Sequence, residues 1–431
     1  LQDFFTKELD DIVRKFPLKE GSTVLRRLPS YEKWAIDILT TGEYTEYWKQ
    51  RGYAISEYYD EHADVPTLYL GGWYDSYARN TCDSYEMLSK MKKSPQHLLM
   101  GPWTHGGFEV TYAGDLEFGT ESPINQNDVH LAWFDYYLKG MVTEVSEWSP
   151  VQIFTMGQGK YKFDSDQDIK VFGSANVISA PTSDRVNHGG YWRGESDWPL
   201  PGTDFVPYYL CGDGTLSEKQ DLRQLDITSY RFDPTNPVPT IGGGISAAIP
   251  IMEPGAFDQR GRTDFFNCVD RLPLNTRHDV VSFQTDILDK DVEVTGPIEM
   301  HLWASSSAVD TDFTAKLIDV YPASIDYPEG LSINLTDSII RARYRNGWEK
   351  PEMMKPGEVY EFVFKLYPTS NIFANGHRIR LDISSSNWPR FDVNPNSGKN
   401  LGTDRTYQIA HQTIYHSSKY QSHVKLPTSM K

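Results

Sequence analysis

Several features that define broad classes of protein are missing from this chain of 431 residues. Its three cysteines, Cys82, Cys211 and Cys268, are too few and too scattered for a disulfide framework or a zinc site. It has no run of 18 apolar residues, so we expect no membrane-spanning helix. Asp and Glu (59) outnumber Lys and Arg (42), and the net charge of −17 argues against nucleic acid or an anionic membrane as partner.

Motifs for cofactors and metals are also missing. No phosphate-cradling glycine loop is present, and we expect no cofactor. The pairs Asp289-x-Asp291 and Asp310-x-Asp312 lack the spacing of a calcium loop, so we expect solvated loop carboxylates and no metal site. The sequence begins at Leu1 without an initiator Met or a signal-like segment, so we expect it to be internal to a longer protein, and its compartment stays undecided.

Two short apolar runs, Val65–Asp75 and Gln96–His105, each end in a glycine-containing turn followed by one polar side chain, Asp75 or His105. Apolar residues between the runs recur at helical spacing and predict the buried face of a helix: Tyr77, Thr81, Tyr85, Leu88 and Met91. Strand, helix and strand within about 40 residues indicate a βαβ unit with parallel strands. Asp75 and His105 should then lie together past the carboxyl ends of neighbouring strands, where open α/β sheets place their chemistry.

Helical patterns lie on either side of this unit. Residues 1–62 are expected to be helical and irregular, with one face at residues 4–13 and a second that starts at a predicted N-cap, Ser30, and contains Tyr31, Trp34, Ala35, Ile38 and Leu39. Such an aromatic-rich segment suits either part of a lid or plain core packing. A further helix is predicted from about Asn127 to a stop at Gly140, with one side formed by Val129, Trp133, Phe134, Tyr137 and Leu138.

From about Pro150 the apolar pattern changes to period 2. Four segments alternate clearly, at residues 298–304, 340–345, 360–366 and 378–383, and turn residues separate them. Strands with one buried face and one solvent-exposed face predict an antiparallel sandwich or jelly roll. At this length two domains are the default, so the sequence predicts an α/β unit followed by an all-β unit.

Several local motifs, in order, resemble the cocaine-esterase/X-prolyl dipeptidyl-peptidase family of serine hydrolases. Residues 66–75 resemble its acid-bearing strand, Gly101–His105 its histidine loop, and Trp133–Gly140 the helix that follows. In the β domain, the family's jelly roll is resembled by residues 208–210, 213–217, 376–381, 388–392 and 394–396. The resemblance implies residues 1–62 as the end of a helical cap, 63–148 as the C-terminal part of an α/β-hydrolase domain, and 149–431 as a jelly-roll β-sandwich.

By position, the resemblance implies Asp75 as the acid and His105 as the base of a catalytic triad. Histidine suits the role of base because its ordinary pKa is about 6.5, and the carboxylate fixes its tautomer. Trp73, Tyr74 and Trp103 either line an aromatic substrate pocket or pack in the core.

One part of the family pattern is absent. No G-x-S-x-G elbow occurs in the chain, and the nearest string, Gly244–Ala248, follows the histidine, whereas the family's serine precedes the acid. Ser76 adjoins Asp75 and is therefore on the wrong strand end. We expect the nucleophile to lie upstream of Leu1, so that the chain alone has little or no turnover.

The leading hypothesis is a hydrolase that cleaves small esters, amides or X-Pro peptides through an acyl-enzyme. The rival is a non-catalytic protein whose jelly roll binds carbohydrate or a protein partner. A sheet that lacks its neighbouring strands exposes an edge and apolar surface, so we also expect either self-association or a companion N-terminal segment.

Overall fold

The computed structural model describes residues 19–23, 25–157, 184–220, 226–247, 251–404 and 406–428, so the face predicted at residues 4–13 lies outside the described residues. In chain order the elements are α2 (Pro29–Thr40), the 3₁₀ helix η1 (Ile55–Tyr58), β1 (Thr67–Tyr74), α3 (Ala78–Met91), β2 (Gln96–Thr104), β3 (Tyr112–Ala113), β4 (Leu116–Glu117), α4 (Gln126–Lys139), η2 (Glu144–Glu147), β5 (Val151–Met156), β6 (Val186–Asn187), β7 (Gly190–Glu195), β8 (Asp204–Leu210), β9 (Leu216–Ser217), β10 (Ile227–Phe232), η3 (Leu274–Thr276), β11 (Val281–Gln284), β12 (Val292–Ser306), β13 (Asp312–Tyr321), β14 (Leu331–Arg341), η4 (Ala342–Tyr344), β15 (Tyr360–Phe373), β16 (Arg378–Ser384), β17 (Ala410–Tyr415) and β18 (His423–Thr428).

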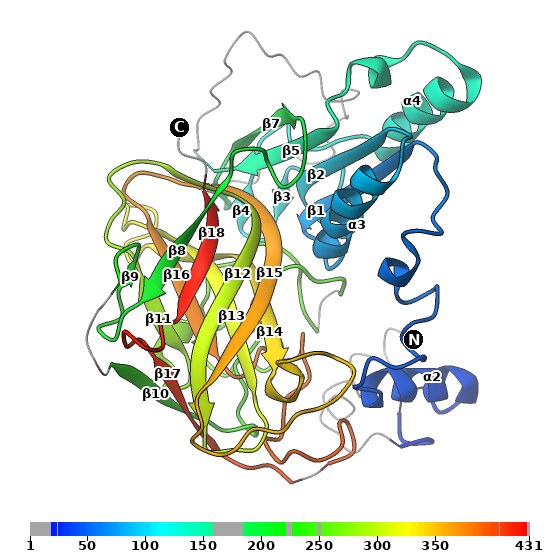
Figure 1. Ribbon diagram of the computed structural model, residues 1–431. Helices are drawn as coiled ribbons and strands as arrows, with labels where there is room; N and C mark the ends of the chain where they lie inside the picture. Colours follow the sequence, from blue (N-terminus) through cyan, green and yellow to red (C-terminus); the bar gives the residue numbers. More distant parts are fainter. Residues whose placement is uncertain are drawn as a thin grey trace.

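The βαβ unit forms as predicted. β1 and β2 pair in parallel, and α3 connects them (Figure 1). β5 adds to the other side of β2, also in parallel, and β7 pairs with β5 antiparallel. The sheet of the α/β unit therefore continues into β5 and β7, beyond residue 149. β1 forms the outer edge of this sheet among the described strands.

The helix periodicity located the helices better than it located their buried faces. On α3, Tyr85 and Leu88 are buried as predicted, but Tyr77 and Met91 are 57% and 44% exposed. Both lie at helix ends, where the apolar spacing continues after the contact with the sheet has stopped. Helical spacing identifies an apolar stripe, and the length of the neighbouring sheet decides how much of that stripe is covered.

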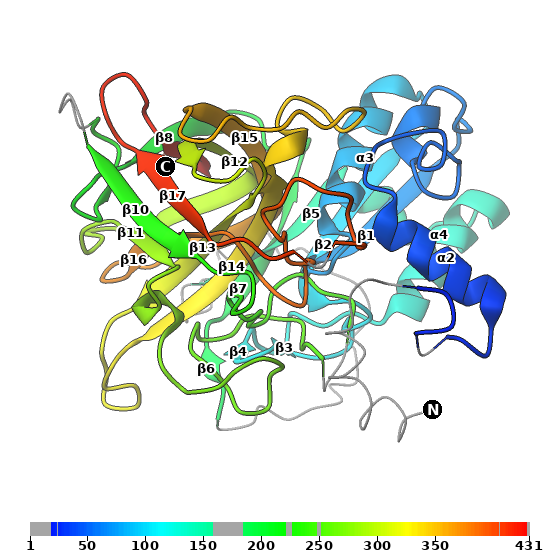
Figure 2. The ribbon, with the colours of Figure 1, turned by 90° about the horizontal axis from the view of Figure 1, so that it is seen from below.

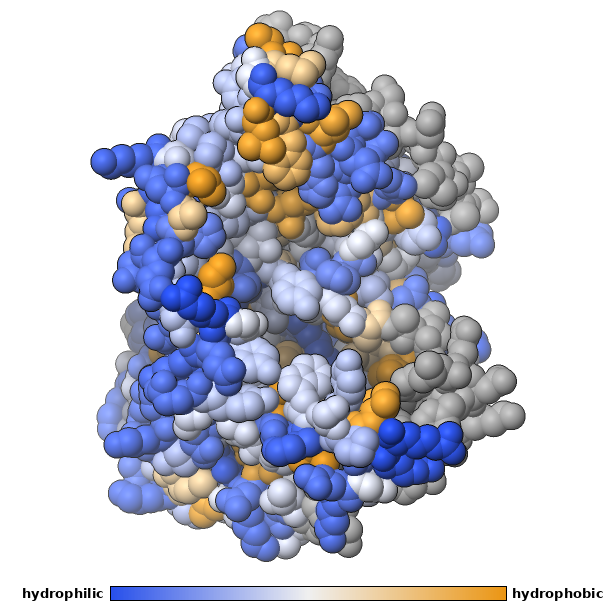
Figure 3. Space-filling model, turned by 90° about the vertical axis from the view of Figure 1, so that its right-hand side faces the viewer, coloured by the Kyte–Doolittle hydropathy of each residue, from blue (hydrophilic) through white to orange (hydrophobic). Residues whose placement is uncertain are grey.

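Two further helices differ from the prediction in detail. α2 begins at Pro29 and its N-cap is Leu28, so the prediction of Ser30 as N-cap was wrong; proline is favoured at the first helical position because it has no N–H to satisfy. α4 ends at Gly140 in the left-handed conformation, as predicted. Figure 3 shows hydrophobic side chains gathered at the end of the molecule where α4 lies, and Leu131, Phe134 and Leu138 are exposed there.

The all-β unit is a sandwich of two sheets. One contains β15, β12, β18, β8 and β9, with β17 and β10 alongside; the other has the order β11-β16-β13-β14. Figure 2 shows the two layers from below, with β10 and β17 along one side. The alternating residues predicted at 298–304, 360–366 and 379–383 point into the core between the sheets, where their apolar members are buried or half-buried. This confirms the predicted period-2 pattern for β12, β15 and β16.

The prediction of a fourth alternating strand, at residues 340–345, was partly wrong. β14 ends at Arg341, and Ala342–Tyr344 form a 3₁₀ turn in which all three residues are buried. The turn is fixed by ion pairs. Arg341 pairs with Asp312 and Arg343 with Asp310, so these two aspartates are buried and are not the solvated loop carboxylates predicted.

The end of β1 is attached by hydrogen bonds to β5 and to β14 of the sandwich. The Trp73 Nε1–H donates to the Phe154 carbonyl oxygen at 2.8 Å, and the Tyr74 hydroxyl donates to the Asn334 carbonyl oxygen at 3.4 Å. One strand contact, between Met156 of β5 and Asn371 of β15, joins the sheet of the α/β unit to that of the sandwich. These contacts fix the carboxyl end of β1 relative to the β unit.

Candidate active site

Asp75 and His105 meet at the rim of the α/β sheet. The His105 Nδ1 lies 3.1 Å from the Asp75 Oδ2. The Asp75 side chain is 7% exposed, whereas that of His105 is 54% exposed. The predicted juxtaposition is therefore present: a buried carboxylate contacts an imidazole that is open to solvent.

Strand register explains why the two side chains meet. Tyr74 on β1 is paired with Thr104 on β2, so the next residue of each strand leaves the sheet at the same edge. The register shifts between Gly72 and Tyr74, and a Cβ on Gly72 would lie only 2.2 Å from the Trp103 carbonyl oxygen. Glycine at position 72 thus permits the close strand approach that aligns the two ends.

The hydrogen bonds of the carboxylate set the tautomer of His105. The Asp75 Oδ1 accepts from the Tyr77 backbone N–H at 3.0 Å, which leaves Oδ2 to face the imidazole. An ionised carboxylate only accepts hydrogen bonds, so the His105 Nδ1 is the donor. The Nε2 of His105 has no hydrogen-bond partner among the described residues and is available as a base.

The aromatic residues predicted as either pocket or core are core residues in this structure. Trp73, Tyr74 and Trp103 are each at most 1% exposed. The Trp103 Nε1–H donates to the Ser122 carbonyl oxygen at 2.9 Å, and burial raises the pKa of Tyr74 well above its ordinary value. Because all three rings are covered by protein, none of them lines an open pocket in the described structure.

A loop of the β unit also reaches the site, which sequence reasoning did not foresee. A Cβ built on Gly244 would lie 3.0 Å from the Asp75 carbonyl oxygen, and the Ser246 and Ser76 hydroxyls hydrogen-bond to each other. This loop contains the run Gly242–Gly244. Three consecutive glycines were the available signal, because they permit a backbone to approach another backbone closely.

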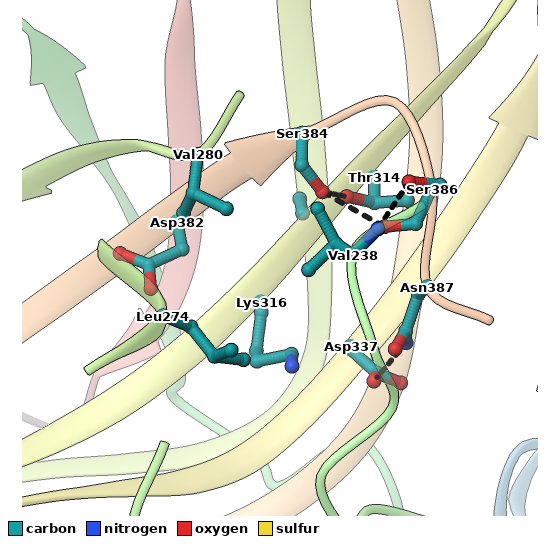
Figure 4. A pocket seen from close by; sticks show the side chains of 11 residues that line it. Val238, Leu274, Val280, Thr314, Lys316, Asp337, Asp382, Ser384, Ser386 and Asn387 are labelled. Atoms are coloured by element: carbon teal, nitrogen blue, oxygen red, sulfur yellow. Dashed lines mark hydrogen bonds between the residues drawn. The ribbon is translucent and has the colours of Figure 1, made fainter. Parts of the chain in front are cut away.

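The β unit contains a second cluster of charged residues. Lys316 on β13 is directly opposite Asp337 on β14 and Asp382 on β16. Figure 4 shows Lys316 between the two aspartates in a small recess that also contains Thr314, Ser384, Ser386 and Asn387. Lys316 is 8% exposed, and its Nζ donates to the Gln259 Oε1 at 2.6 Å. Each aspartate is paired with an arginine instead, Asp337 with Arg390 and Asp382 with Arg380.

Burial of Lys316 predicts a pH dependence of stability. Burial lowers the pKa of its amine below the ordinary value of 10.5, and the nearby Asp337 and Asp382 oppose this only in part. Between the lowered pKa and 10.5 the unfolded chain binds a proton that the folded chain has released, so the contribution of Lys316 to the free energy of unfolding rises with pH. Denaturant unfolding at several alkaline pH values should show this rise relative to Lys316→Met. Parallel pH profiles for the two proteins would contradict it.

Within the described ranges, no group of three or more His, Cys, Asp or Glu side chains is arranged to hold a metal ion. No helix in the same ranges combines the length and the apolar character needed to cross a bilayer.

The parallel strand ends, the Asp–His pair and the appended sandwich define the architecture of an α/β-hydrolase with a C-terminal β domain. Residues 6–107 match the model of the X-Pro dipeptidyl-peptidase (S15) family, and residues 150–425 match the X-Pro dipeptidyl-peptidase C-terminal non-catalytic domain. The chain belongs to this family of hydrolases, which includes cocaine esterase.

Individual relatives support the same family assignment. The chain is 32% identical over 376 residues to the cocaine esterase of a Rhodococcus species, across 84% of this chain and 56% of that protein. An α-amino acid ester hydrolase structure is similar with a TM-score of 0.73 and 25% identity, across 94% of this chain and 61% of that one. An aminopeptidase from a Thaumarchaeota archaeon has the same fold, with a TM-score of 0.73 and 22% identity over the same shares. The chain spans little more than half the length of the curated relatives that it matches.

Proposed function

We propose that this chain supplies the acid, Asp75, and the base, His105, of a serine hydrolase that cleaves ester or amide bonds through an acyl-enzyme. The observation that carries the proposal is the 3.1 Å contact between the His105 Nδ1 and the Asp75 Oδ2 at two parallel strand ends. The family membership supports the same chemistry, because the similar proteins are named as an esterase, an ester hydrolase and an aminopeptidase.

In the proposed reaction, the His105 Nε2 takes the proton of a serine hydroxyl while the serine oxygen attacks the substrate carbonyl carbon. The imidazolium that forms is stabilised by the Asp75 carboxylate, and it then donates its proton to the leaving alcohol or amine. Water repeats the sequence on the acyl-enzyme and releases the acid. Small acyl esters, aminoacyl esters and peptides with proline at the second position all fit this chemistry.

We further propose that the serine lies outside residues 1–431. No G-x-S-x-G elbow occurs in the sequence, and Ser246, the centre of the nearest string, lies on the β-unit loop, where its hydroxyl bonds to that of Ser76. A serine so placed has no strand-to-helix elbow to expose it. The edge of β1 that no described strand covers is where further parallel strands that carry such an elbow would add to the sheet.

A fluorophosphonate probe tests the proposal. We expect no covalent labelling of the 431-residue chain, and stoichiometric labelling of one serine in a polypeptide extended upstream to include an elbow. Replacing His105 by Gln in the extended polypeptide should abolish labelling, whereas replacing the exposed His130 should not.

Two outcomes would contradict the proposal. Labelling of Ser246 or Ser76 in the chain itself would place the nucleophile within residues 1–431. An upstream sequence without a strand, elbow and helix would instead favour a non-catalytic binding protein.

A further inference from the structure

Residues 238–247 and 251–280 form a segment that covers the face of the small sheet that carries Lys316, and the segment also reaches Asp75. Its own apolar cluster contains Val238, Ile241, Phe257, Phe265, Leu274 and Val280. Beneath it lies the row of charges centred on Lys316. At its other side, Gly244 packs against the Asp75 carbonyl oxygen. The segment therefore connects a buried lysine of the β unit with the proposed catalytic acid.

Arg390 lies beside the contact between the loop and Asp75. Arg390 lies next to the loop, since a Cβ on Gly243 would be 3.0 Å from its Nη1 and a Cβ on Gly244 would be 3.8 Å from its Nη2. The Arg390 guanidinium pairs with Asp337 and lies over the Tyr367 ring, 5.1 Å from its centroid. The ion pair and the ring contact place the Arg390 guanidinium beside both the loop and Asp75.

Lys316 acts on the same loop through Gln259. The Lys316 Nζ donates to the Gln259 Oε1 at 2.6 Å, and the Gln259 Nε2 donates to the Ile241 and Phe257 carbonyl oxygens, each at 2.9 Å. The Gln259 side chain is 1% exposed. An amide has one acceptor and one donor end, so the bond from Lys316 determines which end of Gln259 faces Ile241.

Burial of a lysine at position 316 costs free energy of desolvation, and packing alone does not explain why a lysine is there. A buried ammonium must give up its hydration, and Lys316 forms no ion pair with any described residue. An apolar side chain would fill the central strand at lower cost. What the lysine provides and an apolar residue cannot is a donor that fixes the orientation of Gln259.

We infer that Lys316 is a positioning residue for the Asp75–His105 pair, acting through Gln259 and the loop Ile241–Gly244, which lies against the Asp75 backbone. The inference rests on the proposed function, because it takes Asp75 as the triad acid. It adds that the β unit, and not only the α/β sheet, determines the geometry of the catalytic pair.

The first experiment reads the tautomer of His105 in the 431-residue chain, which requires neither substrate nor nucleophile. Long-range ¹H–¹⁵N correlation of the imidazole nitrogens shows which nitrogen carries the proton, and His105→Gln identifies the signal. We expect the proton at Nδ1 in the wild-type chain. Lys316→Met and Gln259→Glu should both give a mixture of Nδ1–H and Nε2–H forms, because the loop no longer holds Asp75 in place.

Gln259→Glu separates positioning from stability. A glutamate keeps an acceptor for Lys316, and even adds an ion pair, but loses the amide that donates to Ile241. The matched control is Lys425→Met, which removes a half-buried lysine on β18 that bonds to Glu299 away from the loop. The control should keep the wild-type tautomer.

Gly244→Ala tests the last contact directly. Its Cβ would meet the Asp75 carbonyl oxygen at 3.0 Å, so one of the two must shift by a few tenths of an ångström. The control is Gly52→Ala, where nothing lies within 4 Å of the new Cβ. We expect Gly244→Ala, but not Gly52→Ala, to change the His105 tautomer.

Kinetics of a polypeptide extended to include the nucleophile provide the second readout. Lys316→Met and Gln259→Glu should lower kcat by about 10- to 100-fold with little change in KM, because misplacing a catalytic group slows the reaction without weakening ground-state binding of the substrate.

A wild-type tautomer in both variants would overturn the inference, even if Gly244→Ala changes the tautomer. If Lys316→Met does not fold, Gln259→Glu alone decides. Failure of the proposed function would give a different result. The extended polypeptide would be inactive, while His105 in the 431-residue chain would still carry its proton at Nδ1.

Discussion

Replacing Asp75 by Asn in a polypeptide that contains the serine should lower kcat by about 10⁴-fold, the loss seen for the same change in a serine protease triad. The hydrogen bonds around Asp75 explain why. The Tyr77 N–H needs an acceptor, so the amide oxygen of an asparagine would take the place of Oδ1. Its NH₂ group would then face the His105 Nδ1, which must become an acceptor. The proton moves to Nε2, and the imidazole is no longer a base toward serine.

Steady-state kinetics check this result. KM should change little, because Asp75 is covered and the change removes an interaction made mainly in the transition state. Asp128→Asn, at an exposed position in the first turn of α4, is a matched control and should leave kcat unchanged. A loss smaller than about tenfold in the Asp75→Asn protein would mean that this carboxylate is not the partner of the catalytic base.

The central geometry was predictable because it depends on local patterns. Two short apolar runs and a helical stretch define a βαβ unit, and parallel strands end at the same edge of a sheet. Asp75 and His105 each follow such a run immediately, so their meeting follows from the register of Tyr74 and Thr104. The alternation in β12, β15 and β16 was equally local, and it gave the sandwich core.

What the sequence did not reveal depends on contacts between distant segments. The loop at Gly244 touches Asp75 across about 170 residues of chain, and no periodicity records such a contact. The same reason applies to Trp73 and Trp103. An apolar pattern shows that a ring avoids water, but whether protein or substrate covers it depends on what packs against it. Here Trp198 packs against Trp73, and Phe108 and Trp192 pack against Trp103.

Buried charge was the hardest feature to predict. Asp310 and Asp312 were expected in a solvated loop, yet they are 0% and 1% exposed. Their partners, Arg343 and Arg341, follow about 30 residues later, where the alternating pattern predicted a solvent-exposed strand face. An aspartate and an arginine separated by a strand connection look the same in sequence whether they are solvated or paired in the interior. Only the packing of β13 against β14 decides between these states.

The pair Asp310–Arg343 gives the largest expected change in stability. Arg343 donates from Nε to the Asp310 Oδ2 at 2.8 Å, and the side chains are 5% and 0% exposed. Replacing Arg343 by Met leaves a buried carboxylate without its cation, which should lower the free energy of unfolding by about 3–5 kcal/mol. Denaturant unfolding, followed by the shift of the transition midpoint, measures the loss.

A second variant shows whether the loss comes from the unpaired charge. In Asp310→Asn/Arg343→Met, the asparagine oxygen still accepts from the backbone N–H of residue 343, which bonds to Asp310 at 3.0 Å, but neither charge of this pair remains. The double variant should therefore recover most of the stability lost in Arg343→Met. Lys33→Met, at an exposed pair on α2, should change little in either background. Equal losses for the single and double variants would show that Arg343 stabilises the fold by packing, and that the carboxylate tolerates burial without it.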